Sequence, residues 1–382
     1  MYSLPYIIFV VIFSLLAYLS FQYRSVEKSN YYILFLLYLF FLGFRGYVGS
    51  DFFMYYEVFQ NLPVFDGKWS YQLLSDVTIE KGFLLYMTLV KSIFNDYSFF
   101  VFANTFINII CILVFLRRYS SNVALSLIVF LEIGGLIFET DVLRNMKSVL
   151  LFILSIKYIE QRRLLPFLAF NLIGFSMHSS AIIYLPMYWL INRPIGLKTF
   201  WVLFVLGNIV YLGKIHILSI AVTPFLSLLG GRFELLSNNY LDTGIVSDYG
   251  FTMGFFLRIT VALMISYYYE RIKALHSYNI IFINCIFIYL LLFCYFSEIR
   301  ILAIRMTNLF FFSYAVIIPQ FVYLFRIRSN QIIYIGIVCL ISILKVNGKI
   351  NTPIYEYDSV LFEHKDAYER KINIDDFYIG LE

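Results

Sequence analysis

The sequence predicts an all-α polytopic membrane protein with about 12 transmembrane helices, and three observations support this prediction. Of the 382 residues, 61% are hydrophobic and only 14% are charged, whereas soluble proteins average about 45–50% apolar and 25% charged residues. Aromatic residues make up 20% of the chain, and tyrosine in particular favours the headgroup layer of a bilayer. Apolar runs of roughly 20 residues, the length that crosses a bilayer as a helix, recur along the chain.

The apolar runs define the expected helices in order. Runs with the length of a full span lie at 4–22, 98–116, 122–138, 143–160, 251–269, 278–296 and 305–325. Shorter or interrupted runs, which we also interpret as spans, lie at 30–44, 164–177, 179–192, 199–213 and 331–346. The first run lacks the basic start and the small-residue cleavage site of a signal peptide, so we expect a retained helix.

The loops between these runs differ in charge, which predicts the side on which each lies. Basic residues favour the cytoplasmic side of a membrane. They are concentrated at Arg117/Arg118, Arg162/Arg163, Arg193/Lys198, Arg271/Lys273 and Arg326/Arg328. If these basic loops lie inside, then the loops 44–80, 139–144, 231–250 and 297–304 lie outside. Two more apolar segments, 81–95 and 215–230, break this alternation when counted as full spans, so we do not count them.

We interpret residues 1–346 as one integral membrane domain, with larger outer loops at 44–80 and 231–250. Residues 347–382 are polar and are expected to form a solvated tail or a surface helix. The net charge of +5 lies mostly in short basic loops and indicates topology, not nucleic-acid binding. No P-loop, HExxH or GxSxG motif is present, which argues against an ATPase, a metalloprotease or an esterase. The chain has no room for an α/β domain that binds nucleotide sugars, so a sugar donor would be lipid-borne.

The first outer segment, FRGYVGSDFFMYYEVF, carries charged residues at the end of a membrane helix. A charge costs at least about 2.5–3.5 kcal/mol at the bilayer centre, so charges that persist there pair, line a cavity or act. Gly46 and Gly49 allow the backbone to turn after Arg45. Asp51 and Tyr55 are four residues apart and share a face of the following helix. The segment therefore predicts a site with a guanidinium and a carboxylate; alternatively, Arg45 reaches to headgroups and Asp51 caps the helix.

Arginines on the same outer side are candidates for binding an anion. Arg144 and Lys147 are one turn apart at the start of a helix, where the helix dipole favours phosphate. The alternative is a surface pair between Asp141 and Arg144. Arg300 and Arg305 lie in SEIRILAIR, about 140° apart around a helix, so they would not point the same way.

Two further ionisable residues complete the set of candidates. Glu80 opens the segment IEKGF, and His178 lies in FSMHSS between two membrane helices. A lone histidine is more often a hydrogen-bonded structural residue than a catalyst. The position of His178 on the same side as carboxylates and arginines of distant loops makes it a candidate base.

These segments, in this order, resemble the EpsG-like, Wzy-type polymerases of bacterial O-antigen, capsule and exopolysaccharide assembly. The resemblance covers most of residues 40–325 and rests on FRGYVGSDFFMYYEVF, IEKGFLLYMTLV, LRNMKSVLLFILSIKYIEQRRLLPFLAF, GFSMHSSAIIYLPMYWL and IRMTNLFFFSYAVIIPQ. They are similar to the family's Arg/Gly/Asp/Tyr segment, Glu-x-Gly-Phe element, arginine-led helix, Phe-x-x-His-x-Ser helix pair and late arginine helix. Lys81 stands where the family commonly has proline, and Asn145 where glutamine often follows the arginine.

The resemblance implies a GT-C-like fold and a polymerase in the bacterial inner membrane that acts at the periplasmic face. Such an enzyme transfers a growing glycan from undecaprenyl diphosphate onto the non-reducing end of a new lipid-linked repeat unit. In the related GT-C class, a helix lies on the membrane near an acidic residue of the first outer loop, which would account for 81–95. The implied partners are the lipid-linked donor and acceptor, the bilayer, a flippase and a chain-length regulator. No cofactor is implied.

The proposed transfer needs a base for the acceptor hydroxyl and positive charge for the leaving diphosphate. The candidate bases are Asp51, His178 and Glu80. Arginine binds phosphate oxygens in a bidentate manner, and the candidates for diphosphate or substrate binding are Arg45, Arg144, Lys147, Arg300, Arg305 and Tyr55. With these guanidiniums a metal is not required. The alternatives are a GT-C glycosyltransferase that uses an undecaprenyl-phosphate sugar, a lipid-linked oligosaccharide flippase or transporter, and a membrane acyltransferase.

Overall fold

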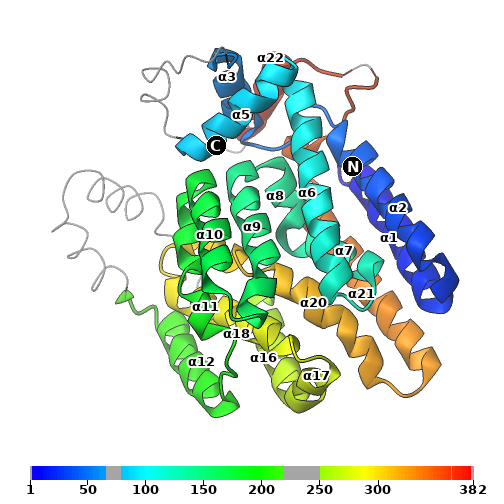
Figure 1. Cartoon of the computed structure of the whole chain (residues 1–382), viewed down its shortest axis with the longest axis vertical. Helices are drawn as coiled ribbons and strands as arrows, with labels where there is room; N and C mark the ends of the chain where they lie inside the picture. Colours follow the sequence, from blue (N-terminus) through cyan, green and yellow to red (C-terminus); the bar gives the residue numbers. More distant parts are fainter. Residues whose placement is uncertain (1, 66–78, 218–249, 363, 380–382) are drawn as a thin grey trace. The chain divides into compact units, whose positions relative to one another are not determined.

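The computed structural model describes residues 2–65, 79–217, 250–362 and 364–379. Within these ranges the regular structure is helical, and the one pairing of extended backbone is an isolated bridge between Arg45 and Ser359. The chain divides into two compact units, residues 1–188 with 318–382 and residues 189–317. Each unit is described by itself, with the element labels of Figure 1.

The first unit is built on long helices that pack along one another. α1 (Leu4–Gln22) contacts α21 (Arg328–Ile350) and α7 (Val123–Phe130). α2 (Glu27–Tyr38) continues directly into a π-helical turn, η2 (Leu39–Gly43). The turn η2 packs on α6, which follows later in the chain.

The remaining long helices of this unit follow in order. α6 spans Tyr97–Tyr119. A second π-helical turn, η3 (Leu131–Gly135), joins α7 to α8 (Leu136–Thr140), so that residues 123–140 form one continuous helical segment. α9 (Leu143–Glu160) and α10 (Leu164–Met177) form a tightly packed hairpin.

Two short helices cover the end of this unit where α6 begins and α10 ends. α3 (Phe52–Asn61) and α5 (Lys81–Ile93) contact each other and α6, and α5 also contacts α10, as Figure 1 shows. The side chains of Phe59, Phe83 and Phe100 fill the space between them and are 0% exposed. With 13 residues, α5 is too short to cross a bilayer, which agrees with leaving 81–95 out of the predicted spans.

A buried lysine fixes the end of α3 on α5. The ammonium of Lys91 donates hydrogen bonds to the carbonyls of Phe59, Gln60 and Leu62, at 2.7, 2.9 and 2.8 Å. The last carbonyls of a helix lack partners within the helix and carry partial negative charge, so a cation stabilises them. This contact helps to set where α3 ends.

The C-terminal segment packs on the turn that follows Arg45, whereas its polar composition predicted a solvated tail or a surface helix. It contains the short turn η6 (Pro353–Tyr355) and α22 (Ala367–Ile379), which contacts α3. The backbone N–H groups of Gly46 and Gly49 donate to the carbonyls of Asp358 and Ile354, at 3.0 and 3.1 Å. Backbone groups of this segment pair with the turn, a contact that composition does not reveal, and α22 is a helix on the surface.

Arg370 of α22 is the anchor of this C-terminal docking. Its side chain is only 1% exposed. Its guanidinium donates to the carboxylate of Glu356 at 2.6 Å and to the carbonyls of Tyr47 and Pro353 at 2.9 and 2.8 Å. A buried guanidinium with this many partners ties residues more than 300 positions apart into one structure.

The number of full-length spans is smaller than predicted. By length and hydropathy, the helices among the described residues that are able to cross a membrane are α1, α6, α7–α8, α18 and α21, and residues 302–324, bent by 55°, would add a sixth. Shorter apolar helices are α10, α12 and α16. α9 is long enough but contains four charged residues, Arg144, Lys147, Lys157 and Glu160. The predicted span 179–192 is a 3₁₀ segment, η4 (Ser179–Tyr184), followed by α11 (Met187–Leu190), because Pro186 cannot donate to a continuous helix.

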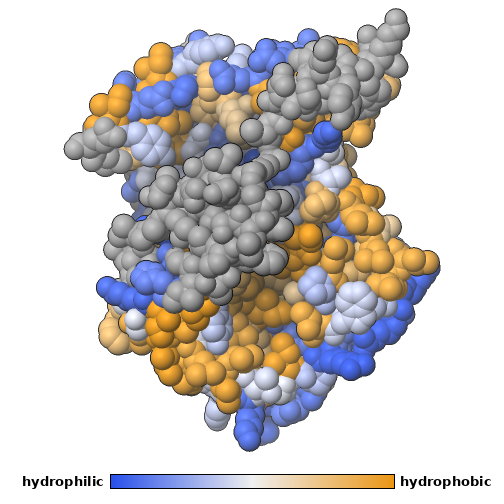
Figure 2. Space-filling model, turned by 90° about the vertical axis from the view of Figure 1, so that its left-hand side faces the viewer, coloured by the Kyte–Doolittle hydropathy of each residue, from blue (hydrophilic) through white to orange (hydrophobic). Residues whose placement is uncertain are grey.

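The helices expose large apolar side chains, as lipid-facing helices do. Leu165 of α10 is 80% exposed, and many other aliphatic and aromatic residues exceed half. Figure 2 shows broad hydrophobic areas on the viewed face, in orange. A soluble monomer rarely exposes apolar surface on this scale, so the chain is a multi-pass membrane protein.

The second unit is organised around α18 (Asn279–Phe296), which contacts four other helices. These are α12 (Leu197–Leu212), α16 (Met253–Tyr267), α17 (Tyr269–Leu275) and α19 (Arg300–Asn308). α20 (Phe312–Gln320) follows α19. The predicted loop 231–250, apart from its last residue, and the segment 218–230 lie outside the described residues.

Candidate active site

A buried ion pair joins the ends of two helical segments in the first unit. Arg45 and Glu139 follow the π-helical turns η2 and η3, elements that frequently occur at functional sites. Arg45 is 3% exposed and Glu139 is 0% exposed. The Arg45 guanidinium donates to the Glu139 carbonyl at 2.6 Å, to the Thr105 hydroxyl at 3.0 Å and to the Leu42 carbonyl, and it lies 3.9 Å from the Glu139 carboxylate. Arg45 is therefore held by fixed protein partners.

The carboxylate of Glu139 continues this network across α6. It accepts hydrogen bonds from Thr105, Asn108 and Tyr38, at 2.7, 2.9 and 3.1 Å. The ammonium of Lys147 donates to the side-chain oxygen of Asn108 at 2.6 Å, and Lys147 is only 7% exposed. A buried charge needs such partners because it has lost its water. The network gives the buried ammonium of Lys147 a hydrogen-bond partner.

The turn after Arg45 is held by Asp141, which is 4% exposed. Gly49 has a φ of 101°, a conformation that favours glycine, and a side chain there would collide with the Asp141 carboxylate. That carboxylate accepts the backbone N–H groups of Ser50 and Asp51 and the hydroxyl of Tyr355, the last at 2.6 Å. Asp141 thus organises the start of α3 and does not make the surface pair that the sequence left open.

Asp51 stands at the N-cap position of α3, but its carboxylate accepts no hydrogen bond from the first turn of that helix. It lies 3.4 Å from the Ser50 hydroxyl. One turn later, the hydroxyl of Tyr55 accepts a hydrogen bond from Arg144 Nε at 3.4 Å. Burial raises the pKa of the Tyr55 hydroxyl; the Arg144 guanidinium lowers it in part, and the charge of Asp51 raises it again. Asp51, Tyr55 and Arg144 therefore share one electrostatic environment.

An ion pair joins Arg144 and Glu80 in this region. Arg144 Nη1 and Glu80 Oε2 are 2.6 Å apart, and the two side chains are 21% and 22% exposed. The other Glu80 oxygen accepts the backbone N–H of Ser179 at 3.1 Å. Gly82 allows α5 to approach α10 closely here, because a side chain would collide with Ser176. Segments that are distant in the sequence thus place an acid and an arginine together, 64 residues apart.

The ionisation of Glu80 follows from its partners. Burial by itself raises the pKa of this carboxyl, but the Ser179 N–H and the charges of His178 and Arg144 outweigh it, so the pKa lies below its usual value. Glu80 is consequently a carboxylate at neutral pH. A carboxylate with a lowered pKa is a weak base, and this one is suited to positioning Arg144.

His178 ends α10 and begins η4, beside the same cluster. Its Nδ1 accepts the backbone N–H of Ser180 at 3.1 Å. A nitrogen that accepts a hydrogen bond carries no proton, so the neutral ring carries its proton on Nε2. The Ser180 hydroxyl lies 2.8 Å from Nδ1 and 3.2 Å from the side-chain oxygen of Asn145, and its single proton serves one of these two acceptors. These contacts fix the orientation of the His178 ring beside the cluster.

The second unit holds a separate group of cations around a cavity of about 310 Å³. Arg258 lines it from α16 and Arg300 from α19, with Tyr211 and Ser297. The Arg258 guanidinium lies over the Phe293 ring, 3.1 Å from its centroid, and its buried Nε has no hydrogen-bond partner among the described residues. Such a cavity is suited to an anion.

The two late arginines predicted from the sequence stand on one short helix. Arg300 begins α19 and Arg305 lies in its last turn, and both side chains are exposed. Of the two, Arg300 lines the cavity with Arg258. Glu298, just before α19, is 5% exposed and lies 3.4 Å from a ring nitrogen of His216.

A comparison with models of known protein families tests the family resemblance that the sequence predicted. The model of the EpsG family matches residues 28–359, most of the chain. The chain belongs to the EpsG family. This is a Wzy-like family of polysaccharide polymerases, and the match includes both groups of cations described above. No curated protein and no solved structure matches the chain.

The structure sorts the candidates of this EpsG-family chain into three groups. Asp51, Tyr55, Glu80, Arg144 and His178 come together in the first unit. Arg45 and Lys147 belong to the buried Glu139 network, and Arg300 and Arg305 belong to the second unit.

Sequence reasoning did not select Arg258 or the partners in the C-terminal segment. Arg258 had a visible signal, since it is an arginine in the middle of an otherwise apolar helix. Tyr355 and Arg370 had none, because polar composition alone does not reveal a docking partner more than 200 residues away.

Proposed function

We propose that this EpsG-family chain is a glycosyltransferase that joins undecaprenyl-diphosphate-linked repeat units at the periplasmic face of the bacterial inner membrane. The observation that carries the proposal is the pair of Glu80 and Arg144, 2.6 Å apart and partly exposed, with Tyr55, Asp51 and His178 around it. The pair lies where apolar helices end. A lipid-linked diphosphate carries its charge at this level, just outside the hydrocarbon.

In the proposed reaction, the acceptor hydroxyl oxygen attacks the anomeric carbon of the donor glycan. The bond between this carbon and the diphosphate oxygen breaks, and the diphosphate leaves on its lipid with the electron pair. A base takes the proton of the hydroxyl, and positive charge stabilises the leaving group. Arg144 is assigned to the diphosphate. Its Nη1 donates to Glu80 and its Nε donates to Tyr55. Its Nη2 offers two further donors to a phosphate.

Asp51 is the proposed base. Glu80 is committed to Arg144 and Ser179, and its pKa is lowered. His178 uses its Nδ1 to accept the Ser180 N–H, so its Nε2 donates. Asp51 stands at the start of α3, one turn from Tyr55, and its charge acts on the Tyr55 hydroxyl that Arg144 contacts. We therefore assign positioning of Arg144 to Glu80 and a hydrogen bond to the substrate to His178.

Polymerisation requires two lipid-linked substrates and hence two diphosphate sites. Arg144 provides one of them in the first unit. The cavity lined by Arg258 and Arg300 in the second unit is the proposed second site, and Arg305 remains a candidate beside it. Guanidiniums at both sites supply the charge that a metal would otherwise supply. A flippase that delivers repeat units and a chain-length regulator are the expected partners.

The purified chain in lipid nanodiscs, supplied with lipid-linked repeat units and no other donor, should build a ladder of products. Asp51→Asn should abolish the ladder, whereas Glu57→Gln, on an exposed position of the same helix, should not change it. A ladder of normal length from Asp51→Asn would refute the base assignment.

The same preparation separates the alternative functions. Addition of a single sugar, only when an undecaprenyl-phosphate sugar is supplied, would identify a GT-C decorating enzyme instead. Movement of the lipid-linked unit across the bilayer without any new glycosidic bond would identify a flippase.

A further inference from the structure

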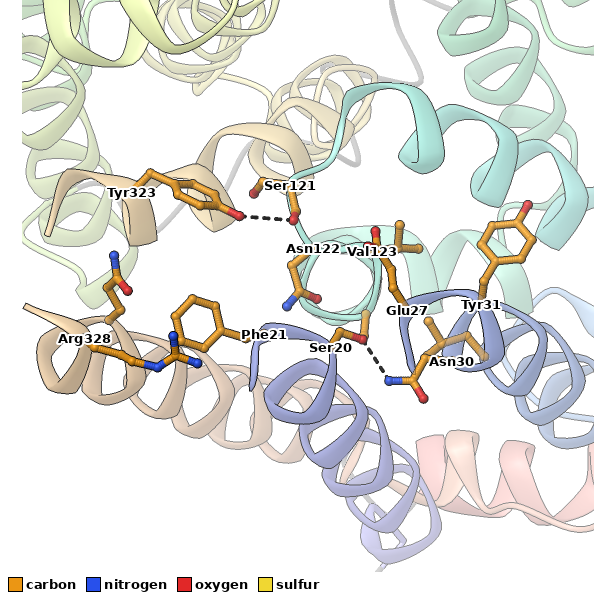
Figure 3. A pocket seen from close by; sticks show the side chains of 13 residues that line it. Ser20, Phe21, Glu27, Asn30, Tyr31, Ser121, Asn122, Val123, Tyr323 and Arg328 are labelled. Atoms are coloured by element: carbon orange, nitrogen blue, oxygen red, sulfur yellow. Dashed lines mark hydrogen bonds between the residues drawn. The ribbon is translucent and has the colours of Figure 1, made fainter. Parts of the chain in front are cut away.

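A polar cavity of about 380 Å³ lies in the first unit, away from the proposed active site. It is bounded by the end of α1 at Ser20, the start of α2 at Glu27, the start of α7 at Asn122 and the start of α21 at Arg328. Figure 3 shows these side chains around it. The turn at Arg45 lies beyond the C-terminal end of α2, after η2. The volume is in the range of sites for small molecules, about 300–1,000 Å³.

The ends of three candidate membrane spans meet at this cavity. They are α1, α7–α8 and α21, so the cavity lies where the apolar length of each helix stops. This is the level of lipid headgroups in a bilayer. The rings of Tyr31 and Tyr323 also line it, and Tyr323 is 48% exposed. Tyrosine is enriched at this level of a membrane.

Two opposite charges face the cavity without forming an ion pair with each other. Figure 3 draws Arg328 and Glu27 on opposite sides of it. None of the ion pairs among the described residues includes either side chain. Arg328 Nη2 donates to the side-chain oxygen of Gln22 at 3.0 Å, and the guanidinium lies 5.4 Å from the centroid of the Phe21 ring. The rest of its donors remain for a ligand.

The polar groups beside Arg328 add to its attraction for an anion. α2 and α21 begin at the cavity, and neither has a side-chain cap. The first N–H groups of an uncapped helix carry partial positive charge and bind anions. The buried hydroxyl of Ser121 lines the cavity and has no hydrogen-bond partner among the residues that the structure describes.

We infer that this cavity binds the headgroup of a zwitterionic aminophospholipid. The phosphate lies at Arg328 and the start of α21, and the ammonium lies at the Glu27 carboxylate. A purely anionic headgroup would bring its charge toward Glu27, and a purely cationic group would meet Arg328 and two helix dipoles. A phosphate that carries an amine satisfies both charges at once. The inference is independent of the proposed catalytic function.

The test uses the full chain, purified in detergent and stripped of lipid. Phosphatidylethanolamine or phosphatidylglycerol is added to the micelles, and binding is followed by native mass spectrometry and thermal unfolding. Phosphatidylethanolamine should bind about tenfold more tightly than phosphatidylglycerol, a difference of about 1.4 kcal/mol. Soluble phosphoethanolamine at high concentration should displace it, because the headgroup alone makes the charged contacts.

Variants assign each half of the site. Glu27→Gln should remove the preference for phosphatidylethanolamine, and Arg328→Gln should weaken binding of both lipids. Arg326→Gln removes the same charge from an exposed neighbour that does not line the cavity, and should change neither. The inference is overturned if the unaltered chain binds both lipids equally, if soluble phosphoethanolamine displaces nothing, or if Glu27→Gln keeps the preference.

Discussion

Two of the acid–arginine pairs in the first unit differ in burial and in how many partners each has. Arg45 and Glu139 are at most 3% exposed and are bound by hydroxyl, amide and carbonyl groups on every side. Glu80 and Arg144 are about one fifth exposed and keep donors free for another group. The same two residue types therefore serve different ends. A saturated pair fixes helices in place, whereas a partly exposed pair is able to exchange partners when a substrate arrives.

Glu139→Ala should have the largest effect on stability. It leaves the Arg45 guanidinium buried beside no carboxylate, and removing one member of a buried pair costs about 3–5 kcal/mol. Thermal unfolding in detergent, together with the yield of folded protein in the membrane, measures the loss. Glu139→Gln is the matched control, since it keeps the shape and part of the hydrogen bonding. An unchanged unfolding temperature for Glu139→Ala would contradict the structural role.

Arg144→Ala should show the opposite pattern, with little loss of stability and a large loss of activity. A partly exposed ion pair contributes only about 0.2–1 kcal/mol to stability, but removing a group that stabilises charge in the transition state costs about 10²–10³-fold in rate. We expect a nearly unchanged unfolding temperature and loss of long glycan products on a gel. Arg144→Lys keeps the charge but not the fork, and should recover only part of the activity. Equal losses of stability and activity would erase the distinction between the two pairs.

Arg370→Ala should have an intermediate effect on stability, because it releases the C-terminal segment from the turn after Arg45. Hydrogen bonds to charged groups contribute about 1.5–3 kcal/mol. Hydrogen exchange should increase in α22 and at residues 46–51 together. Asp376→Ala, at an exposed position of the same helix, serves as the control. Faster exchange in α22 without any change at 46–51 would show that the docking does not support the turn.

Glu80→Gln should have the smallest effect, on the order of 0.2–1 kcal/mol, and that effect should depend on pH. The folded-state pKa of Glu80 lies below the ordinary value of 4.5. A lowered pKa contributes stability that is present above the unfolded value and is lost as the pH falls through the folded value. The difference in unfolding temperature between the unaltered chain and Glu80→Gln should thus be full near pH 7 and should narrow below about pH 4.5. Glu57→Gln should show no such trend.

Much of the fold was predictable because it depends on local periodicity. The apolar runs at 4–22, 143–160 and 164–177 coincide with α1, α9 and α10. The prediction was wrong at 179–192, where Pro186 prevents a continuous helix. The count of about 12 spans is not confirmed, because by length and hydropathy five or six helices among the described residues are able to cross a membrane.

The order of the charged segments was also predictable, but not which charges pair. Spacing places Asp51 and Tyr55 on one face of α3, as a local rule requires. It does not reveal that Glu80 meets Arg144, 64 residues away in the sequence, or that Arg45 meets Glu139, 94 residues away. Such pairs depend on how distant helices pack.

The sequence by itself determined that this chain is a membrane protein. It also determined where most of its helices lie along the chain, and which family its charged segments resemble. These follow from composition and local order, because lipid demands apolar helices and each motif is continuous in the chain. Only the tertiary structure showed that Arg45 and Lys147 are buried in the Glu139 network, that Arg144 is paired yet partly exposed, and that the C-terminal segment docks on the turn at Gly46. The physical reason is that burial and partner choice are properties of packing between segments, and no short stretch of sequence contains them.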